Sequence, residues 1–244
     1  MLRRLRRFGQ CPGYTEHMRR ILLFDIDMTM VRTDGAGRGA MEAAFQREFG
    51  VEKATQGMVF DGRTDRWIFL ECLERHGFGG AALSSNFQRL SESYLDDLPA
   101  WIAQKGGIVL PGVRELLAAL DAEDALVGLA TGNMRRGAAH KLGHFGLWEH
   151  FSGGGFGDQH TVRAELVRDG IAELEATFGL APGRSEVIVL GDTPLDIEAA
   201  HLAGAKAFGV GTGRYSPEQL RDSGAEFAMP DLSDTARALE MLLG

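Results

Sequence analysis

The sequence predicts an α/β fold in which a parallel sheet carries helices on both faces and a helical segment is inserted into the chain. Short apolar runs, typical of strands buried on both faces, alternate with helical patterns that end at glycine. Such alternation is typical of βαβ units and therefore of a parallel sheet. One long stretch near the N-terminus contains helical patterns but no apolar run, which indicates the insertion.

Each expected element rests on its own pattern. Four apolar runs of strand length predict the sheet, and five helical patterns lie near or between them. The expected strands are 21–26, 125–130, 186–190 and the weaker 205–210. The expected helices are 36–49, 113–120, 134–145, 164–178 and 195–202.

The insertion is expected to be helical. Residues 66–75 and 84–104 have helical patterns, and Ser84 and Ser85 are candidate N-caps for the second helix. We therefore expect a sheet domain formed by 20–34 and 106–244, with a helical domain at 35–105. A sheet domain with long crossovers would give much the same secondary structure, so this alternative stays open.

Composition excludes several classes of protein. The chain has 244 residues with 44% hydrophobic and 25% charged residues, which suits a globular fold. A net charge of -8 repels nucleic acid and anionic membranes, and no apolar run reaches the length of a membrane helix. Two cysteines are too few for a disulfide framework, which favours a reducing, cytoplasmic compartment. We expect a monomer or homodimer.

The N-terminus differs from the rest of the chain. Residues 1–20 contain six arginines and one glutamate, whereas the remainder is strongly acidic. An organelle transit peptide is one reading, but the segment lacks serine enrichment and a long amphipathic run. We expect residues 1–19 to be a basic, disordered lead-in.

Carboxylates follow two of the expected strands. Asp25 and Asp27 come directly after the first apolar run, and side chains two apart on a strand share a face. Asp192 and Asp196 follow another buried run in the same way. Ligands bind at the carboxyl ends of parallel strands, and clustered carboxylates favour a hard cation such as Mg²⁺. If the two strands are neighbours, Asp192 can complete a metal site with the first pair.

Groups that can hold an anion follow another strand. Thr131, Gly132 and Asn133 end the 125–130 run and open a helix, which provides a hydroxyl and free backbone N–H groups. Arg163 precedes the next helical pattern and can supply a fixed positive charge. A metal, carboxylates, N–H donors and an arginine are what phosphoryl transfer requires, because that reaction depends on positioning and charge neutralisation.

The order of these motifs resembles the haloacid dehalogenase (HAD) superfamily of phosphohydrolases, in particular its phosphoglycolate phosphatase-like members. The resemblance runs from about Arg20 to the C-terminus and implies a Rossmann-like core with a helical (C1-type) cap. It implies that Asp25 is the nucleophile that forms an aspartyl-phosphate. Asp27 would be the general acid and base, and its backbone carbonyl would also touch the metal.

The resemblance assigns the other motif residues as well. Thr131 would bind the phosphoryl group through its hydroxyl, with Gly132 and Asn133 beside it. Asp192 would bind Mg²⁺, with Asp196 ordering the site. Arg163 would be the cation of the third motif, for which Lys141 and Arg168 are competitors; the residues around Arg163 resemble the family's arginine-containing version.

Two positions bear on specificity. Arg63 lies in a polar loop before a cap helix, and the resemblance implies that this loop faces the active site, where Arg63 would contact a substrate carboxylate or phosphate. An exposed loop capped by Thr64 or Asp65 is an equally good reading. Met28 stands where the family usually has glycine.

These observations together predict a Mg²⁺-dependent phosphatase that acts on a small phosphorylated metabolite, either phosphoglycolate-like or a sugar phosphate. A phosphosugar mutase would keep the same core and return the phosphoryl group to a sugar. A catalytically silent protein that binds phosphate or metal is the alternative motivated by Met28.

Overall fold

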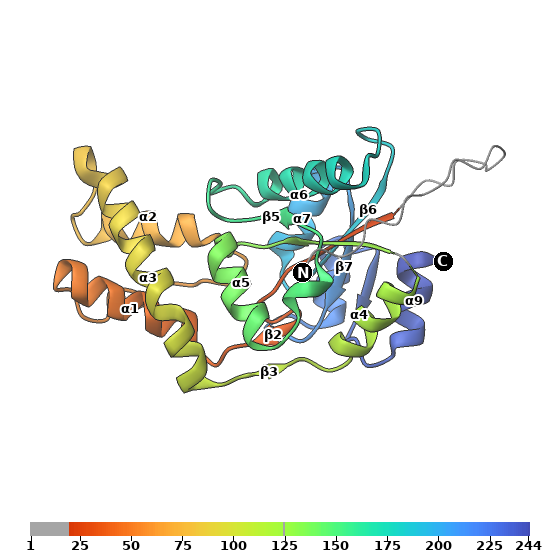
Figure 1. Cartoon of the computed structure of the whole chain (residues 1–244), viewed down its shortest axis with the longest axis horizontal. Coiled ribbons are helices and arrows are strands. Elements are labelled where there is room, and N and C mark those ends of the chain that lie inside the picture. Colours follow the sequence, from red (N-terminus) through yellow and green to blue (C-terminus); the bar gives the residue numbers. More distant parts are fainter. Residues whose placement is uncertain (1–19, 124) are drawn as a thin grey trace.

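The computed structural model describes residues 20–123 and 125–244 and confirms the expected α/β fold with a helical insertion. The sheet and its flanking helices form one end of the molecule, and the insertion forms the other (Figure 1). The basic segment 1–19 lies outside the described residues. Within the described part of the chain, no helix is both long and apolar enough to span a membrane.

The sheet places its three best-predicted strands side by side. Six parallel strands run in the order β5-β4-β1-β6-β7-β8. Central β1 (Arg20–Phe24) lies between β4 (Leu126–Ala130) and β6 (Glu186–Gly191). The outer strands are β5 (Gly154–Gly155), β7 (Lys206–Val210) and β8 (Phe227–Met229). The carboxyl ends of β4, β1 and β6 therefore share one edge of the sheet.

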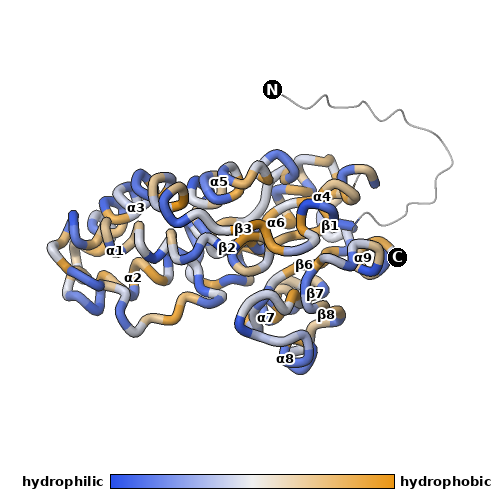
Figure 2. Tube along the Cα trace, turned by 90° about the horizontal axis from the view of Figure 1, so that it is seen from below, coloured by the Kyte–Doolittle hydropathy of each residue, from blue (hydrophilic) through white to orange (hydrophobic). Residues whose placement is uncertain are grey.

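Helices cover both faces of the sheet. One face packs against α4 (Val113–Ala122), α5 (Arg135–His144) and α9 (Thr235–Leu243), and the other against α6 (Arg163–Phe178), α7 (Pro194–Leu202) and α8 (Pro217–Asp222). Alternate side chains of β1 enter the two cores, because successive residues of a strand face opposite sides. The hydropathy of the trace shows the apolar strands enclosed by helices of mixed polarity (Figure 2).

The insertion has a hydrophobic core of its own. It contains α1 (Ala36–Phe49), α2 (Asp65–Arg75) and α3 (Leu83–Lys105), with a 3₁₀ turn at Gly80–Ala82 before α3. A two-stranded antiparallel pair, β2 (Val31–Arg32) and β3 (Ile108–Val109), joins the two connections between the insertion and the sheet domain. We keep 35–105 as the proposed extent of this domain.

The predicted serine cap of α3 is wrong. The helix begins at Leu83, and its N-cap is Ala82, which makes no side-chain cap bond. The preceding 3₁₀ turn runs directly into the helix, and the Leu83 N–H bonds to the Gly80 carbonyl. The turn thus provides an acceptor for one of the free N–H groups at the start of the helix, which a capping side chain would otherwise satisfy. The hydroxyl of Ser85 instead donates to the Ala82 carbonyl.

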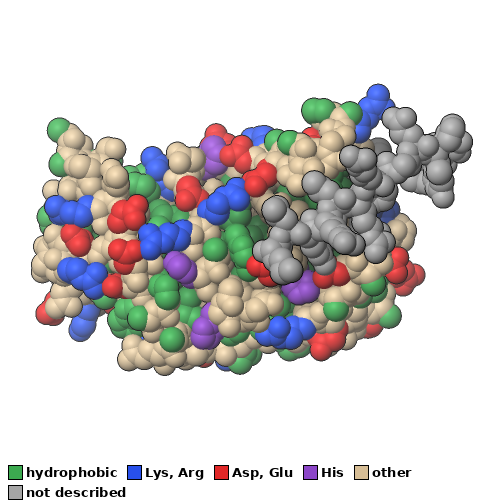
Figure 3. Space-filling model, viewed as in Figure 1, with side chains coloured by type: hydrophobic (Ala, Val, Ile, Leu, Met, Phe, Trp, Pro, Cys, Tyr) green, Lys and Arg blue, Asp and Glu red, His purple; other side chains and the backbone are tan. Residues whose placement is uncertain are grey.

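Charge is mixed over the face of the molecule shown in Figure 3. Basic and acidic side chains lie interspersed on this face rather than in separate fields. Ion pairs also form between the insertion and the sheet domain. Arg136 of α5, for example, pairs with Glu92 and Asp96 of α3.

Candidate active site

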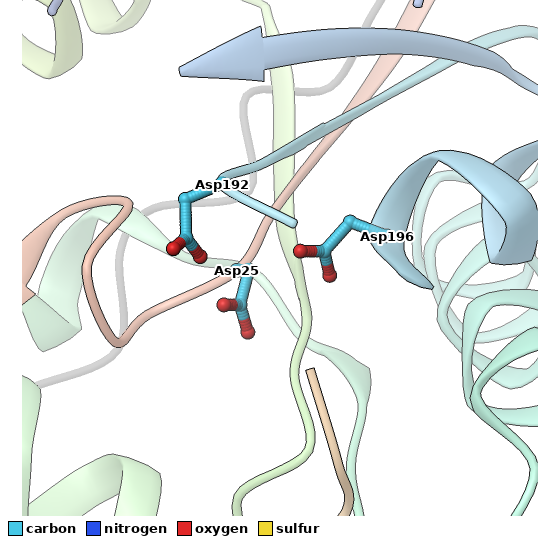
Figure 4. Close-up of side chains that lie close together, drawn as sticks. All are labelled: Asp25, Asp192 and Asp196. Carbon is cyan, nitrogen blue, oxygen red and sulfur yellow. The ribbon is translucent and has the colours of Figure 1, made fainter. Parts of the chain in front are cut away.

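Three buried carboxylates meet at the edge of the sheet. Asp25 directly follows β1, Asp192 directly follows β6, and Asp196 lies in the first turn of α7. One oxygen from each lies within 4.8 Å of the others. Figure 4 shows the three carboxyl groups close together, with those of Asp192 and Asp196 directed toward Asp25. The parallel pairing of β1 with β6 brings Asp25 and Asp192 together, as expected if the two strands were neighbours.

The turn before α7 fixes Asp196 in place. Thr193 and Asp196 form a capping box: the Thr193 hydroxyl accepts from the Asp196 N–H, and Asp196 Oδ2 accepts from the Thr193 N–H at 3.0 Å. Pro194 occupies the first helical turn, where the missing N–H is not needed. These bonds engage Oδ2 and leave Oδ1 to face the other carboxylates and Arg163.

Arg163, the first residue of α6, supplies the positive charge beside these carboxylates. Its Nη2 lies 2.9 Å from Asp25 Oδ1, and it also pairs with Asp196. Burial, together with repulsion from Asp196 and Asp27, raises the pKa of Asp25 to about 6, although Arg163 opposes the shift. Burial and repulsion from Asp196 and Asp25 also raise the pKa of Asp192. One guanidinium against three carboxylates leaves an excess of negative charge.

The residues of this cluster fit a magnesium ion. All three donors are carboxylates, without thiolate or imidazole, and hard divalent cations prefer such oxygen ligands. A divalent cation would also offset the negative charge that Arg163 leaves uncompensated. Gly213 lies against Asp192: a Cβ at 213 would stand 1.9 Å from Asp192 Oδ2, so a larger residue would displace this carboxylate.

Asp27 lies in different surroundings from Asp25. Its side chain is 41% exposed, and it is not one of the three clustered carboxylates. Both of its oxygens accept from Lys141 Nζ, at 2.8 and 2.6 Å, and Oδ2 also accepts from Asn133 Nδ2 at 2.7 Å. Arg163 and Lys141, two of the three candidates for the cation of the third motif, therefore both reach the site but contact different aspartates.

The loop after β4 lies beside both aspartates. Gly132 and Asn133 line the cavity, whereas Thr131 is fully buried behind them. The Thr131 hydroxyl oxygen accepts from the Asn133 side chain at 2.9 Å. Gly132 lies close to Arg163, since a Cβ at 132 would stand 3.0 Å from Arg163 Nη1. Arg168, the remaining competitor for Arg163, instead points to the carbonyl of Leu202.

A cavity of about 410 Å³ separates these residues from the insertion. This volume suits a small molecule rather than a macromolecular segment. The sheet domain lines it with Asp25, Asp27, Gly132, Asn133, Lys141, Arg163 and Asp192. The insertion and its connections contribute Arg32, Arg38, Phe60, Arg63, Asp65 and Tyr94, among others.

The insertion contacts the backbone of the 131–134 loop through both the backbone and the side chain of Asp65. The Asp65 N–H donates to the Gly132 carbonyl at 2.7 Å, and the Met134 N–H donates to Asp65 Oδ2 at 2.9 Å. A Cβ at Gly132 would lie 2.3 Å from the Arg63 carbonyl oxygen, so this close approach requires glycine. The sequence indicates Asp65 only as a candidate helix cap, whereas in the structure this residue lines the cavity.

Arg63 combines the two readings that the sequence left open. It lines the cavity, but its side chain is exposed and its guanidinium stacks on the Trp67 ring at 4.5 Å. Thr64 caps α2 by accepting from the Trp67 N–H. Among residues 20–123 and 125–244, no ion pair to Arg63 is found, so its charge is available to a ligand.

Met28 has the backbone conformation that explains why glycine is usual at this position. Its φ is 61°, in the left-handed region that is unfavourable for side chains with a Cβ. The turn is held by its N–H, which donates to the Val31 carbonyl at 2.9 Å, and by its carbonyl, which accepts from the Thr212 hydroxyl. The turn that follows Asp25 and Asp27 therefore forms with methionine in place.

Comparison with known proteins identifies the family. The haloacid dehalogenase-like hydrolase family matches residues 22–201, which is most of the chain. The protein belongs to this family. The match begins within β1 and ends in α7, so it includes every residue of the carboxylate cluster.

Individual relatives of this HAD-like hydrolase are distant. The probable phosphatase IndB of Dickeya dadantii (strain 3937) is 27% identical over 146 residues, which are 58% of this chain and 60% of that protein. The match thus spans about 60% of the length of this curated relative.

Solved structures with a similar fold are also distant in sequence. A hydrolase from Pseudomonas syringae has a TM-score of 0.67 at 20% identity, with 93% of this chain and 100% of that chain covered. A predicted phosphoglycolate phosphatase from Haemophilus somnus has a TM-score of 0.62 at 18% identity, with 93% and 99% covered. These structures share the fold.

The carboxylate cluster predicts that Mg²⁺ stabilises this HAD-like hydrolase. A ligand that binds only the folded state at a hundred times its Kd adds about 2.7 kcal/mol to the free energy of unfolding. We expect millimolar Mg²⁺ to raise the melting temperature of the wild type, and Asp192→Asn to lose most of that rise. The measurement is the melting temperature of each protein with and without Mg²⁺; equal rises in both would contradict a metal site at Asp192.

Asp65 predicts a pH dependence of stability. Burial raises the pKa of Asp65 from 3.8 to about 6, with Lys141 opposing the shift. The folded state therefore binds more protons than the unfolded state, and the contribution of Asp65 to stability falls as pH rises from about 4 to about 6. Asp65→Asn keeps an acceptor for the Met134 N–H and removes this ionisation.

The difference in free energy of unfolding, Asp65→Asn minus wild type, should therefore increase by about 1–2 kcal/mol as pH rises from 4.5 to 7.5. Denaturant titrations at several pH values measure the difference between the two proteins. A difference that stays constant over this range would show that Asp65 has an ordinary pKa.

Proposed function

We propose that the protein is a Mg²⁺-dependent phosphatase that hydrolyses small phosphomonoesters through an aspartyl-phosphate on Asp25. The observation that carries this proposal is the different setting of two aspartates that are two residues apart. Asp25 is buried beside Arg163 and two further carboxylates, whereas Asp27 is partly exposed and held by Lys141 and Asn133. One setting suits a nucleophile and the other a proton donor.

The buried aspartate is suited to attack phosphorus. A carboxylate with a pKa of about 6 is still mostly ionised at neutral pH, so Asp25 needs no general base. Arg163 keeps the Asp25 carboxylate in place and offers positive charge to a phosphoryl group beside it. Asp25, Asp192 and Asp196 would hold Mg²⁺, which when bound supplies further positive charge to the transferring group.

Asp27 acts as the general acid and then as the general base of the reaction. As the bond from phosphorus to the leaving oxygen breaks, Asp27 donates a proton to that oxygen, and a water molecule takes the place of the alcohol. Asp27 then removes a proton from this water as it attacks the aspartyl-phosphate, which releases inorganic phosphate and restores both carboxyl groups. The 131–133 loop contributes polar groups for the phosphoryl oxygens, and Thr131 is expected to act there through its hydroxyl.

The cavity supports a small phosphorylated metabolite as the substrate. Its volume is about 410 Å³, and the insertion closes over it through the Asp65 contacts with the 131–134 loop. Arg63, for which the described residues provide no ion-pair partner, places a cation on its wall. Together these features favour a phosphomonoester with a second anionic or polar group, such as phosphoglycolate or a sugar phosphate. We propose that it acts in the cytoplasm.

The first test of this function replaces the nucleophile. In a phosphate-release screen over small phosphomonoesters, the wild type should release phosphate only with Mg²⁺ present. Asp25→Asn should lower kcat by at least about a thousandfold, because an amide cannot replace the carboxylate as nucleophile. Retained activity in a folded variant would contradict the role of Asp25. Turnover that requires a sugar bisphosphate activator would instead indicate the mutase.

A second test concerns the substrate side of the cavity. Arg63→Ala should raise KM about tenfold for substrates that carry a carboxylate or second phosphate, because a charge-assisted hydrogen bond contributes about 1.5 kcal/mol. Substrates without that group should be unaffected. Arg75→Ala is the control, since Arg75 is an exposed arginine of α2 that pairs with Glu71. The same rise in KM for both substrate classes would exclude this contact.

A further inference from the structure

The ammonium group of Lys141 is almost completely enclosed at the wall of the cavity. This residue of α5 has a side chain that is 6% exposed. Its Nζ lies 2.8 and 2.6 Å from the two oxygens of Asp27 and 2.6 Å from Asn133 Oδ1. An ammonium group has three N–H donors, so these contacts can use all of them. A lysine buried in this way is oriented toward the site rather than toward solvent.

Asn133 closes a ring of contacts with Lys141 and Asp27. Its Nδ2 donates to Asp27 Oδ2 at 2.7 Å and to the Thr131 hydroxyl oxygen at 2.9 Å, while its Oδ1 accepts from Lys141. The Asp27 carboxylate is therefore held through both oxygens. The ring also ties this carboxylate to the 131–133 loop, whose glycine lies beside Arg163.

The insertion covers Lys141 from the other side. A Cβ at Gly37 of α1 would lie 3.9 Å from Lys141 Nζ and 3.8 Å from the hydroxyl oxygen of Tyr94 in α3. Asp65 of α2 is also near enough for the Lys141 charge to influence its pKa. Residues from all three helices of the insertion thus lie near the ammonium group, and the Lys141 side chain is only 6% exposed.

The two buried cations of the site have separate partners. Arg163 pairs with Asp25 and Asp196, whereas Lys141 pairs with Asp27. Removal of the Lys141 charge should therefore disturb Asp27 and leave the surroundings of Asp25 intact. Because the Asp27 side chain is 41% exposed, water would otherwise allow it several orientations.

We propose that Lys141 is a positioning residue that fixes the Asp27 carboxylate for proton transfer to the leaving oxygen. The inference rests on the proposed phosphatase function and adds a residue to its acid and base step. It assigns Lys141 no contact with the phosphoryl group. Loss of Lys141 should then slow reactions that need a proton donor more than reactions that do not.

The test compares two esters in the full-length Lys141→Met variant. The alkyl phosphomonoester that the phosphate-release screen identifies has a leaving oxygen that needs a proton, whereas p-nitrophenyl phosphate releases a stable anion. We expect kcat for the alkyl ester to fall at least tenfold more than kcat for p-nitrophenyl phosphate. KM and the affinity for inorganic phosphate, measured by calorimetry, should change little.

Two variants control for general damage to the fold. Methionine is similar in length to lysine, and the partly exposed Asp27 can be solvated when its partner is lost, so the Lys141→Met variant should fold. Lys206→Met is the matched control, because Lys206 is an exposed lysine that pairs with Glu186 at the opposite end of the sheet. Its kcat for both esters should equal that of the wild type. Lys141→Gln provides the same comparison if Lys141→Met melts at a much lower temperature.

A double-mutant cycle tests whether Lys141 acts through Asp27. Addition of Lys141→Met to Asp27→Asn should cause little further loss of kcat for the alkyl ester, because the group that Lys141 positions is already absent. Lys141→Arg should restore part of the selective loss. Losses that add in full, or equal losses for both esters in a folded variant, would overturn the assignment.

These outcomes separate the inference from the proposed function. A wild type that hydrolyses neither ester would overturn the phosphatase proposal together with the role of Lys141. Normal wild-type turnover with unchanged kcat in Lys141→Met would overturn the role of Lys141 alone.

Discussion

Repulsion between like charges at the carboxyl edge of the sheet is the constraint on which the site depends. β1 and β6 are paired in register, so the residues that follow them, Asp25 and Asp192, are forced together. The capping box of α7 adds Asp196 to this cluster. Such a cluster is unfavourable unless positive charge is close by. Arg163 at the start of α6 supplies part of that charge, and the remaining deficit of positive charge makes the pocket receptive to a divalent cation.

The site also distinguishes between two chemically identical side chains. Asp25 and Asp27 are two residues apart, yet the first is enclosed by carboxylates and a guanidinium, whereas the second meets an ammonium group and an amide beside open space. Met28, directly after Asp27, has a left-handed backbone that turns the chain beside the cavity. The partners around each side chain, rather than residue type, assign different chemistry to the two carboxyl groups.

The sequence predicted the parts of this arrangement that depend on strand order. Asp25, Thr131 and Asp192 each follow a buried apolar run directly, and parallel pairing was enough to bring them to one edge. Short elements escaped prediction: β5 consists of two glycines, and β2 and β3 have two residues each, so they lack a recognisable pattern. The partner of Lys141 could not be predicted either, because it depends on how α5 is rotated against the sheet, which is a property of tertiary packing.

The contacts of Asp65 couple the position of the insertion to the conformation of the loop after β4. The insertion is joined to the 131–134 loop through the Gly132 carbonyl and the Met134 N–H, and both groups belong to the segment that would surround a phosphoryl group. Withdrawal of the insertion to admit a molecule would break these bonds and free the loop at the same moment. The loop would then keep all of its contacts only while the insertion is in place. A phosphate ion that meets the open site would therefore be bound more weakly than a ligand in the closed site.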